Sequence, residues 1–244
     1  MKLIIVETSE QMSRASAELF AQRIRNNPGI ILGLATGGTP ERMYAELVRL
    51  HREEGLDFSQ VVTYNLDEYL GIPGTHDQSY RYFMNKNLFD HINIAKENTH
   101  VLNGLATDAG KECADYETAI KNAGGIDLQL LGIGSNGHIA FNEPGSPADS
   151  RTGVVDLTEN TIKDNARFFE NADDVPKQAL SMGNGTIMEA KEIVLIADKE
   201  SKAAAIFKSI EGPVTEEVPA SILQKHPNCT FIIDRAASGK LSSK

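Results

Sequence analysis

Residues 30–41 read IILGLATGGTPE, and this stretch decides the fold of the chain. An apolar run at Ile30–Ala35 leads into two glycines, and a helix-like pattern then continues to about Glu54. The run is continuous, which indicates a strand covered on both faces, because a half-exposed strand alternates apolar and polar residues. A strand, a glycine loop and a helix in this order are typical of an α/β protein with a parallel sheet.

The same alternation of apolar runs and helix-like segments continues along the chain. We expect Ser9 to cap a helix that ends near Asn26. The alternation predicts a three-layer α/β/α sandwich around a mostly parallel, Rossmann-like sheet. No repeat or linker interrupts it, so we expect residues 1–244 to form a single domain with a flexible polar tail at 236–244. The other strand-like runs are Leu3–Val6, Val61–Leu66, Asp127–Ile133, Glu192–Ala197 and Thr230–Ile233.

The composition excludes several classes of function. The 244 residues include 24 Lys+Arg and 34 Asp+Glu, a net charge of −10, so phosphate backbones and anionic membranes repel the chain. No stretch approaches the roughly 20 apolar residues of a membrane span, and the N-terminal apolar run is too short for a signal peptide. We interpret Cys113 and Cys229 as free thiols in a reducing compartment, which predicts a cytoplasmic protein.

The glycine loop that follows the run at Ile30–Ala35 is a candidate anion site. Gly37 and Gly38 let the backbone approach an anion closely, and the following helix start offers unpaired N–H groups. Thr36 begins the loop, while Thr39 is the expected N-cap and Pro40 the expected first helical residue. The loop alone is equally compatible with an ordinary strand-to-helix turn.

A pair of carboxylates, Asp67 and Glu68, follows the run at Val61–Leu66. Open parallel sheets bind ligands at the carboxyl ends of their strands, and a carboxylate placed there can act as a general base. A solvated turn is the alternative, and the pair in isolation favours it.

The stretch GIGSNGHIAFNEPG at residues 132–145 contains a match to the dinucleotide pattern GxGxxG. We reject that interpretation, because no helical apolar period follows the glycines and a Pro-Gly pair ends the segment. Instead, Asn136, His138, Asn142 and Glu143 form a polar cluster after a strand. A histidine there is a plausible acid/base near neutral pH, and a structural histidine is the alternative. A metal site is weakly supported, because no second His or Cys lies at ligand spacing.

Three motifs together are far more specific than each one alone. They are LATGGTP at residues 34–40, NLDEY at 65–69 and GHIAFNEP at 137–144. In this order and spacing the chain resembles the glucosamine-6-phosphate deaminase family, from the first strand to about Ile233. The related 6-phosphogluconolactonases typically read GHTASLFP where this chain reads GHIAFNEP, so the third motif favours the deaminases over a lactonase-like hydrolase.

The resemblance implies a reaction and a role for several residues. Glucosamine 6-phosphate would be isomerised and deaminated to fructose 6-phosphate and ammonia, a step of amino-sugar catabolism that needs no metal or organic cofactor. The resemblance makes His138 the group that opens the pyranose ring, with Glu143 supporting it. It makes Asp67 the general base that moves a proton between C2 and C1. An intact set of these three residues argues against the other alternative, a non-catalytic sugar-phosphate sensor.

The resemblance also assigns the phosphate contacts to the 36–39 loop, Arg167 and Lys202. An arginine can hold phosphate in a bidentate fork and a lysine acts as a point charge. Without the resemblance, both residues would be interpreted as ordinary surface charges.

Two departures from the family pattern lead to hypotheses. Asn136 stands where many members carry Asp, and an amide cannot stabilise an imidazolium as an anion does, so Glu143 is expected to carry more of that role. Gly153 and Val155 align with basic residues of the allosteric hexameric members, which also have a longer C-terminal end. We therefore expect hyperbolic kinetics that N-acetylglucosamine 6-phosphate does not alter. The sequence leaves open the oligomeric state and whether residues 146–175 act as a lid.

Overall fold

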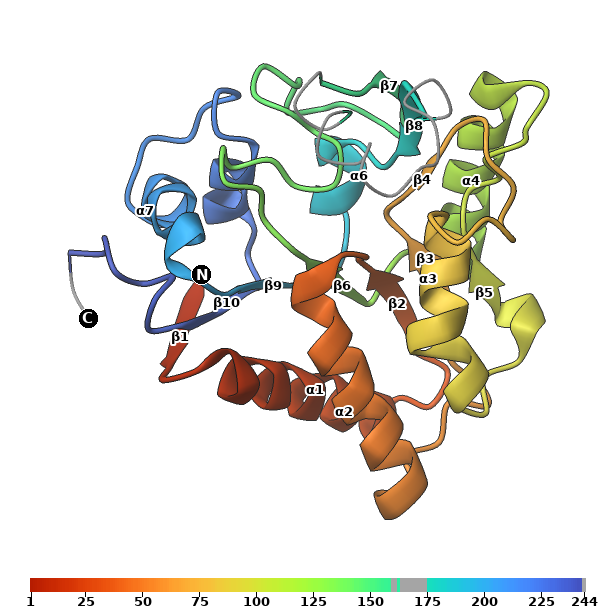
Figure 1. Cartoon of the computed structure of the whole chain (residues 1–244), viewed down its shortest axis with the longest axis horizontal. Helices are drawn as coiled ribbons and strands as arrows, with labels where there is room; N and C mark the ends of the chain where they lie inside the picture. The colour runs from red at the N-terminus through yellow and green to blue at the C-terminus, as the bar shows by residue number, and fades with distance from the viewer. Residues whose placement is uncertain (159–161, 163–174, 243–244) are drawn as a thin grey trace.

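The computed structural model describes residues 1–158, 162 and 175–242 (Figure 1). Its centre is a seven-stranded sheet in the order β1-β10-β9-β6-β2-β3-β5, in which every neighbouring pair is parallel. This confirms the expected α/β fold with its mostly parallel sheet. The strands are β1 Lys2–Val6, β2 Ile31–Leu34, β3 Val62–Asn65, β5 Thr99–His100, β6 Leu128–Leu131, β9 Glu192–Ala197 and β10 Cys229–Asp234.

The strand order creates a switch point in the middle of the sheet. From β2 the chain proceeds outward to β3 and β5, and it then returns to β6, which pairs with the other side of β2. From β6 it proceeds in the opposite direction to β9 and β10, beside β1. Loops that leave the carboxyl ends of β2 and β6 therefore diverge to opposite sides, which opens a crevice where ligands bind in such sheets.

Helices cover both faces of the sheet, as expected for a three-layer sandwich. Figure 1 shows α1 (Ser9–Asn26) and α2 (Gly38–Glu54) together on one side of the strands, with α6 (Asn184–Met188) and α7 (Ala203–Ile210) on the other. The remaining helical segments are α3 Tyr80–Asn87, α4 Ala109–Ala123, η1 Phe89–His91, η2 Lys96–Asn98, η4 Glu200–Lys202 and η5 Pro219–Lys225.

Both predicted helix caps are wrong by one or two positions. Thr8, not Ser9, caps α1, and its side chain accepts a hydrogen bond from the backbone N–H of Gln11 at 3.2 Å. The N-cap of α2 is Gly37, so Thr39 is its second helical residue. The hydroxyls of Ser9 and Thr39 are turned away from cap positions because each donates a hydrogen bond to Asp198.

A second, antiparallel sheet was not predicted from the sequence. It has the order β4-β8-β7, with β4 at Asp67–Tyr69, β8 at Gln178–Ser181 and β7 at Gly153–Asp156. These strands are too short to show an alternating pattern of their own. The sheet matters for the site because it begins at Asp67, which pairs with Ser181.

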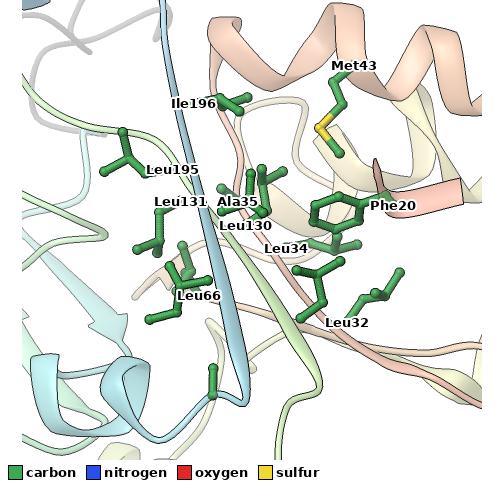
Figure 2. Packing of buried hydrophobic residues seen from close by; sticks show 14 of the residues in the cluster. Phe20, Leu32, Leu34, Ala35, Met43, Leu66, Leu130, Leu131, Leu195 and Ile196 are labelled. Carbon is green, nitrogen blue, oxygen red and sulfur yellow. The ribbon is translucent and has the colours of Figure 1, made fainter. Parts of the chain in front are cut away.

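The main hydrophobic core lies between the large sheet and its helices. In Figure 2, Phe20 of α1 and Met43 of α2 lie close to Leu34 of β2, and all three side chains are fully buried. None of the helices within the described ranges combines the length and apolar character that crossing a bilayer requires.

The C-terminal residues do not form the flexible tail that was expected. Ala237 and Ser238 are fully buried, and Leu241 joins the main core at 5% exposure. Ala237 N–H also donates to the Asp234 carboxylate at 2.7 Å. The expectation is therefore wrong for residues 236–242, because the apolar side chains of Ala237 and Leu241 pack in the main core.

Gly33 has no side chain, and this lets the central strands β2 and β6 pack closely. The side chain of Gln129 on β6 lies across Gly33 on β2, so a Cβ at Gly33 would lie 2.0 Å from Gln129 Oε1. We predict that Gly33→Ala lowers the free energy of unfolding by about 2 kcal/mol, the typical cost of overpacking a buried position. Chemical denaturation would measure this. Gly33→Ala combined with Gln129→Ala should restore most of the loss, and no recovery would contradict the packing argument.

Candidate functional site

A cavity of about 390 Å³ opens at the carboxyl ends of the central strands. It lies at the switch point between β2 and β6, and residues that follow β2, β3, β6 and β9 form its walls. Its position agrees with the general rule for parallel sheets. The predicted residues that line it are Thr36, Gly37, Gly38, Thr39, Asp67, His138 and Lys202.

The glycine loop forms one wall and exposes the start of α2. Gly37 has φ +101°, a conformation that L side chains rarely adopt, and this turn directs the chain into the helix. No side chain caps this terminus among the described residues. A Cβ at Gly37 or Gly38 would meet nothing within 4 Å, so the loop is open on that side, and the first N–H groups of a helix have no partner within the helix.

Lys202 reaches the same cavity from the end of η4. Burial lowers the pKa of its ammonium below the ordinary value, while the charge of Asp198 opposes that shift. A helix N-terminus and a lysine thus meet in one cavity, although they follow different strands. The combination is a positive local environment inside an acidic protein.

Asp67 also lines this cavity, as the first residue of β4. Its side chain is 6% exposed, and burial together with the charge of neighbouring Glu68 raises its pKa from 3.8 to about 8. The position is fixed by pairing with Ser181 and by the hydrogen bond from Met182 N–H to Leu66 O at 2.7 Å. A carboxylate held in this way is a stronger base than one in water.

Glu68 has a different role from Asp67. Its carboxylate accepts the backbone N–H groups of Tyr69, Tyr80 and Arg81 at 2.9, 2.9 and 3.0 Å, which ties β4 to the start of α3. These bonds set Tyr80 in the cavity wall, where its ring stacks on Phe141 with 6.2 Å between centroids. Sequence reasoning missed Tyr80, because only the tertiary contact with Glu68 brings it to the site.

His138 lies in a loop that glycines make possible. Gly134 N–H donates to His138 O at 2.9 Å, and a Cβ at Gly134 would lie 2.3 Å from the imidazole ring. Gly137 has φ +94°, a second turn that favours glycine. No helix begins within residues 132–150, so the rejection of the dinucleotide pattern is confirmed.

Glu143 and Asn136 stand behind the imidazole. His138 Nδ1 lies 3.4 Å from Glu143 Oε1, and the histidine holds the pKa of Glu143 below its usual range. Asn136 Nδ2 donates to Glu143 Oε2 at 2.6 Å, and its Oδ1 accepts the His138 backbone N–H at 3.2 Å. Asn136 therefore positions the carboxylate and the loop, while Glu143 contacts the ring.

Not every polar residue of the third motif belongs to this group. Asn142 is 5% exposed and donates to the backbone oxygens of Ile139 and Met182 at 3.0 and 2.9 Å. It is a structural residue that joins the motif to the end of β8, so its assignment to the polar cluster is wrong. Arg167, the other predicted phosphate ligand, lies outside the described residues.

Two further observations bound the site. A larger cavity of about 510 Å³ lies between the ends of α4 and α6, but none of the predicted site residues lines it. Within the described ranges, no group of three or more His, Cys, Asp or Glu side chains is placed to hold a metal ion. The predicted base Asp67, the predicted acid/base His138 and the predicted phosphate loop therefore all line the 390 Å³ cavity.

The chain matches one family of known proteins over nearly its whole length. The family described as glucosamine-6-phosphate isomerases/6-phosphogluconolactonase matches residues 6–232. A glucosamine-6-phosphate deaminase of Clostridium perfringens is 54% identical over 238 residues, covering 98% of each chain. Glucosamine-6-phosphate deaminase 2 of Giardia intestinalis is 56% identical over 239 residues, which cover 98% of this chain and 91% of the relative.

Solved structures agree with the sequence matches. A monomeric glucosamine-6-phosphate deaminase superposes with a TM-score of 0.95 at 46% identity, covering 98% of this chain and 99% of the other. A 6-phosphogluconolactonase from Trypanosoma cruzi shares the fold with a TM-score of 0.79 at 21% identity, over 99% and 97% of the two chains. On its sequence, its fold and the position of its cavity, the chain belongs to the glucosamine-6-phosphate isomerase/6-phosphogluconolactonase family.

Proposed function

We propose that this chain is an enzyme that converts glucosamine 6-phosphate to fructose 6-phosphate and ammonia, with Asp67 and His138 as the groups that act on the substrate. The observation that carries the proposal is that a buried carboxylate, an imidazole, a lysine and a helix start without a side-chain cap share one cavity. The substrate is supported by the relatives named as glucosamine-6-phosphate deaminases, at 54% and 56% identity over nearly the whole chain.

The phosphate would bind at the start of α2. The unpaired N–H groups of Gly38 and Thr39 donate to its oxygens, and the ammonium of Lys202 supplies a full positive charge. Arg167 stays a proposed additional ligand, assigned by resemblance. This arrangement offsets a net charge of −10 locally, because a small ligand senses nearby dipoles and charges more than the distant ones.

Ring opening would use His138. Its Nδ1 faces Glu143, which leaves Nε2 as the nitrogen that can exchange a proton with the sugar oxygens O5 and O1. When the imidazole gains a proton, the Glu143 carboxylate stabilises the positive charge. The hydrogen bond from Asn136 keeps that carboxylate in place.

Isomerisation would use Asp67. The carboxylate takes the proton from C2 of the open-chain amino sugar and returns a proton to C1, which leaves an iminium at C2. Water then adds to C2, and ammonia departs as the carbonyl of fructose 6-phosphate forms. A desolvated carboxylate suits this step, because abstraction next to a carbonyl needs a basic group held close to the carbon.

A lactone hydrolase is the nearest alternative. Solved structures described as 6-phosphogluconolactonases share the fold at 16–23% identity, which supports a common architecture. The Glu143 contact with His138 favours the deaminase, since sequence reasoning found that carboxylate in the deaminase version of the third motif. Measuring ammonia release from glucosamine 6-phosphate, beside hydrolysis of 6-phosphogluconolactone, separates the two activities. The same ammonia assay separates the enzyme from a non-catalytic sugar-phosphate sensor.

We further propose that the chain acts as a single catalytic domain in the cytoplasm, as the sequence predicts. Both cysteines are buried thiols without a disulfide, which is compatible with a reducing compartment.

Asp67→Asn tests the proposed base. We predict that this variant loses at least about 100-fold in kcat, the usual scale for general-base catalysis, and still binds the substrate. In the wild type, kcat/KM should fall as the pH drops through about 8, because Asp67 then takes up a proton. Steady-state kinetics across pH would measure both. Asp127→Asn, at the opposite end of the sheet, is the control, and equal losses in both variants would contradict the role.

The same variant should be more stable than the wild type at alkaline pH. Because the folded-state pKa of Asp67 is raised from 3.8 to about 8, the folded protein retains a proton that the unfolded chain releases. Stability contributed by this group is therefore lost as pH rises across that interval. Denaturation of Asp67→Asn at pH 8 checks this, and it also shows that lost activity is not lost folding.

Asn136→Asp tests the electrostatics behind His138. The substitution replaces an amide donor with a second carboxylate at hydrogen-bond distance from Glu143. Repulsion between the two anions raises the pKa of the pair and favours the protonated imidazole, so the pH–rate profile should move to higher pH. Gln22→Glu on α1 adds the same charge elsewhere and should leave the profile in place. An unmoved profile in Asn136→Asp would show that Glu143 does not carry this role.

The expected insensitivity to N-acetylglucosamine 6-phosphate can also be tested. Gly153 and Val155 lie on β7, and Arg151 just before them is paired with Glu117 and Glu189. We predict a hyperbolic dependence of rate on glucosamine 6-phosphate that N-acetylglucosamine 6-phosphate leaves unchanged. A sigmoidal curve that this ligand makes hyperbolic would contradict the prediction.

A further inference from the structure

We infer that Asp198 is a positioning residue of the phosphate subsite, which holds the Thr39 hydroxyl so that phosphate is bound by backbone N–H groups and Lys202 instead. This inference rests on the proposed function, because it concerns the same cavity. It adds a residue that does not line the cavity and that sequence reasoning did not single out. Its position directly after the apolar run of β9 was the available signal.

Two hydroxyls converge on the Asp198 carboxylate. Thr39 Oγ1 donates to Oδ1 at 3.0 Å, and Ser9 Oγ donates to Oδ2 at 2.8 Å. Asp198 is only 5% exposed, so the pair of hydrogen bonds replaces most of its hydration. Each carboxylate oxygen thus has one helix start attached to it, that of α2 or that of α1.

The single proton of the Thr39 hydroxyl limits the hydrogen bonds that this side chain can make with a phosphate. A threonine hydroxyl has a single proton, and here that proton is directed to Asp198. The hydroxyl therefore has only lone pairs left, which a phosphate oxygen repels. A phosphate in the cavity must use the backbone N–H groups at the start of α2, which have no side-chain cap.

The contact also links two parts of the subsite that the sheet keeps apart. The glycine loop follows β2 and Lys202 follows β9, and β6 lies between these two strands. Asp198 accepts a hydrogen bond from Thr39 on one side, and its charge raises the pKa of the Lys202 ammonium, which burial lowers. The chain next to it is also fixed, because Lys199 N–H donates to Asp234 at 3.2 Å.

The negative charge of Asp198 and its positioning of the loop should have opposite effects on phosphate affinity. A carboxylate near a phosphate site repels the phosphate, so removing its charge would tighten binding if charge were its only effect. If Asp198 instead positions the Thr39 hydroxyl and the loop, removing its charge weakens binding. The sign of the effect therefore distinguishes the two possibilities.

The primary experiment measures inorganic phosphate binding to Asp198→Asn by calorimetry. We expect the dissociation constant to rise about tenfold, on the scale of one hydrogen bond to a charged group. Asp127→Asn is the matched control, because Asp127 is a carboxylate that binds Ile31 N–H and Lys191 at the other end of the sheet. An unchanged or tighter dissociation constant in Asp198→Asn overturns the inference.

A double-mutant cycle with Thr39→Val tests the coupling directly. If Thr39 acts through Asp198, the double variant should lose no more affinity than the larger single effect, whereas independent contributions would add. Thr39→Ser keeps the hydroxyl and should retain wild-type affinity. Additive losses, or a loss in Thr39→Ser as large as in Thr39→Val, would overturn the inference.

Ser9→Ala provides a second route should Asp198→Asn fail to fold. Ser9 lies on α1 and does not line the cavity, so any effect on phosphate affinity passes through Asp198. We expect a weaker but clear rise in the dissociation constant, and no rise overturns the inference. Ammonia release by the wild type is measured separately. A wild type that binds phosphate without releasing ammonia would refute the proposed function and leave this inference standing.

Discussion

The pairing of β2 with β6 in the centre of the parallel sheet is the constraint on which the site depends. Because the chain leaves these two neighbouring strands in opposite directions, the loops at their carboxyl ends separate and leave a cavity between them. All strands of the large sheet run in one direction, so the segments that follow β2, β3, β6 and β9 meet at the same edge. Groups distant in sequence thereby become neighbours.

Burial gives the cavity its chemical character and has a cost in stability. Asp67 is largely buried beside Glu68, so its pKa rises to about 8 and its charged form is destabilised. Glu68, next to it, is buried too, but three backbone N–H groups hydrogen-bond to it. Among the described residues, hydrogen-bond donors are found for Glu68 and not for the Asp67 side chain, which leaves Asp67 as the group available for proton transfer.

Local geometry, not net charge, governs which ligands the protein can bind. The chain carries a net charge of −10, yet the start of α2 and Lys202 face the same cavity. A long polyanion would meet the acidic surface as a whole, whereas a small sugar phosphate meets only a few groups. The proposed role of Asp198 agrees with this, because a buried carboxylate can lie beside an anion site when two hydroxyls donate hydrogen bonds to it and a lysine interacts with its charge.

The sequence by itself determined the strands of the large sheet except the two-residue β5, together with the glycine loop and the strand ends at Asp67 and His138. It could do so because continuous apolar runs and glycines act locally, through burial and backbone freedom. Only the tertiary structure decided the small sheet, the structural role of Asn142, the contact of Asn136 with Glu143 and the attachment of Thr39 to Asp198. Those features are side-chain hydrogen bonds or short strand pairings between segments from different parts of the fold. No local pattern encodes such partners, since the geometry of the sheet brings them within reach.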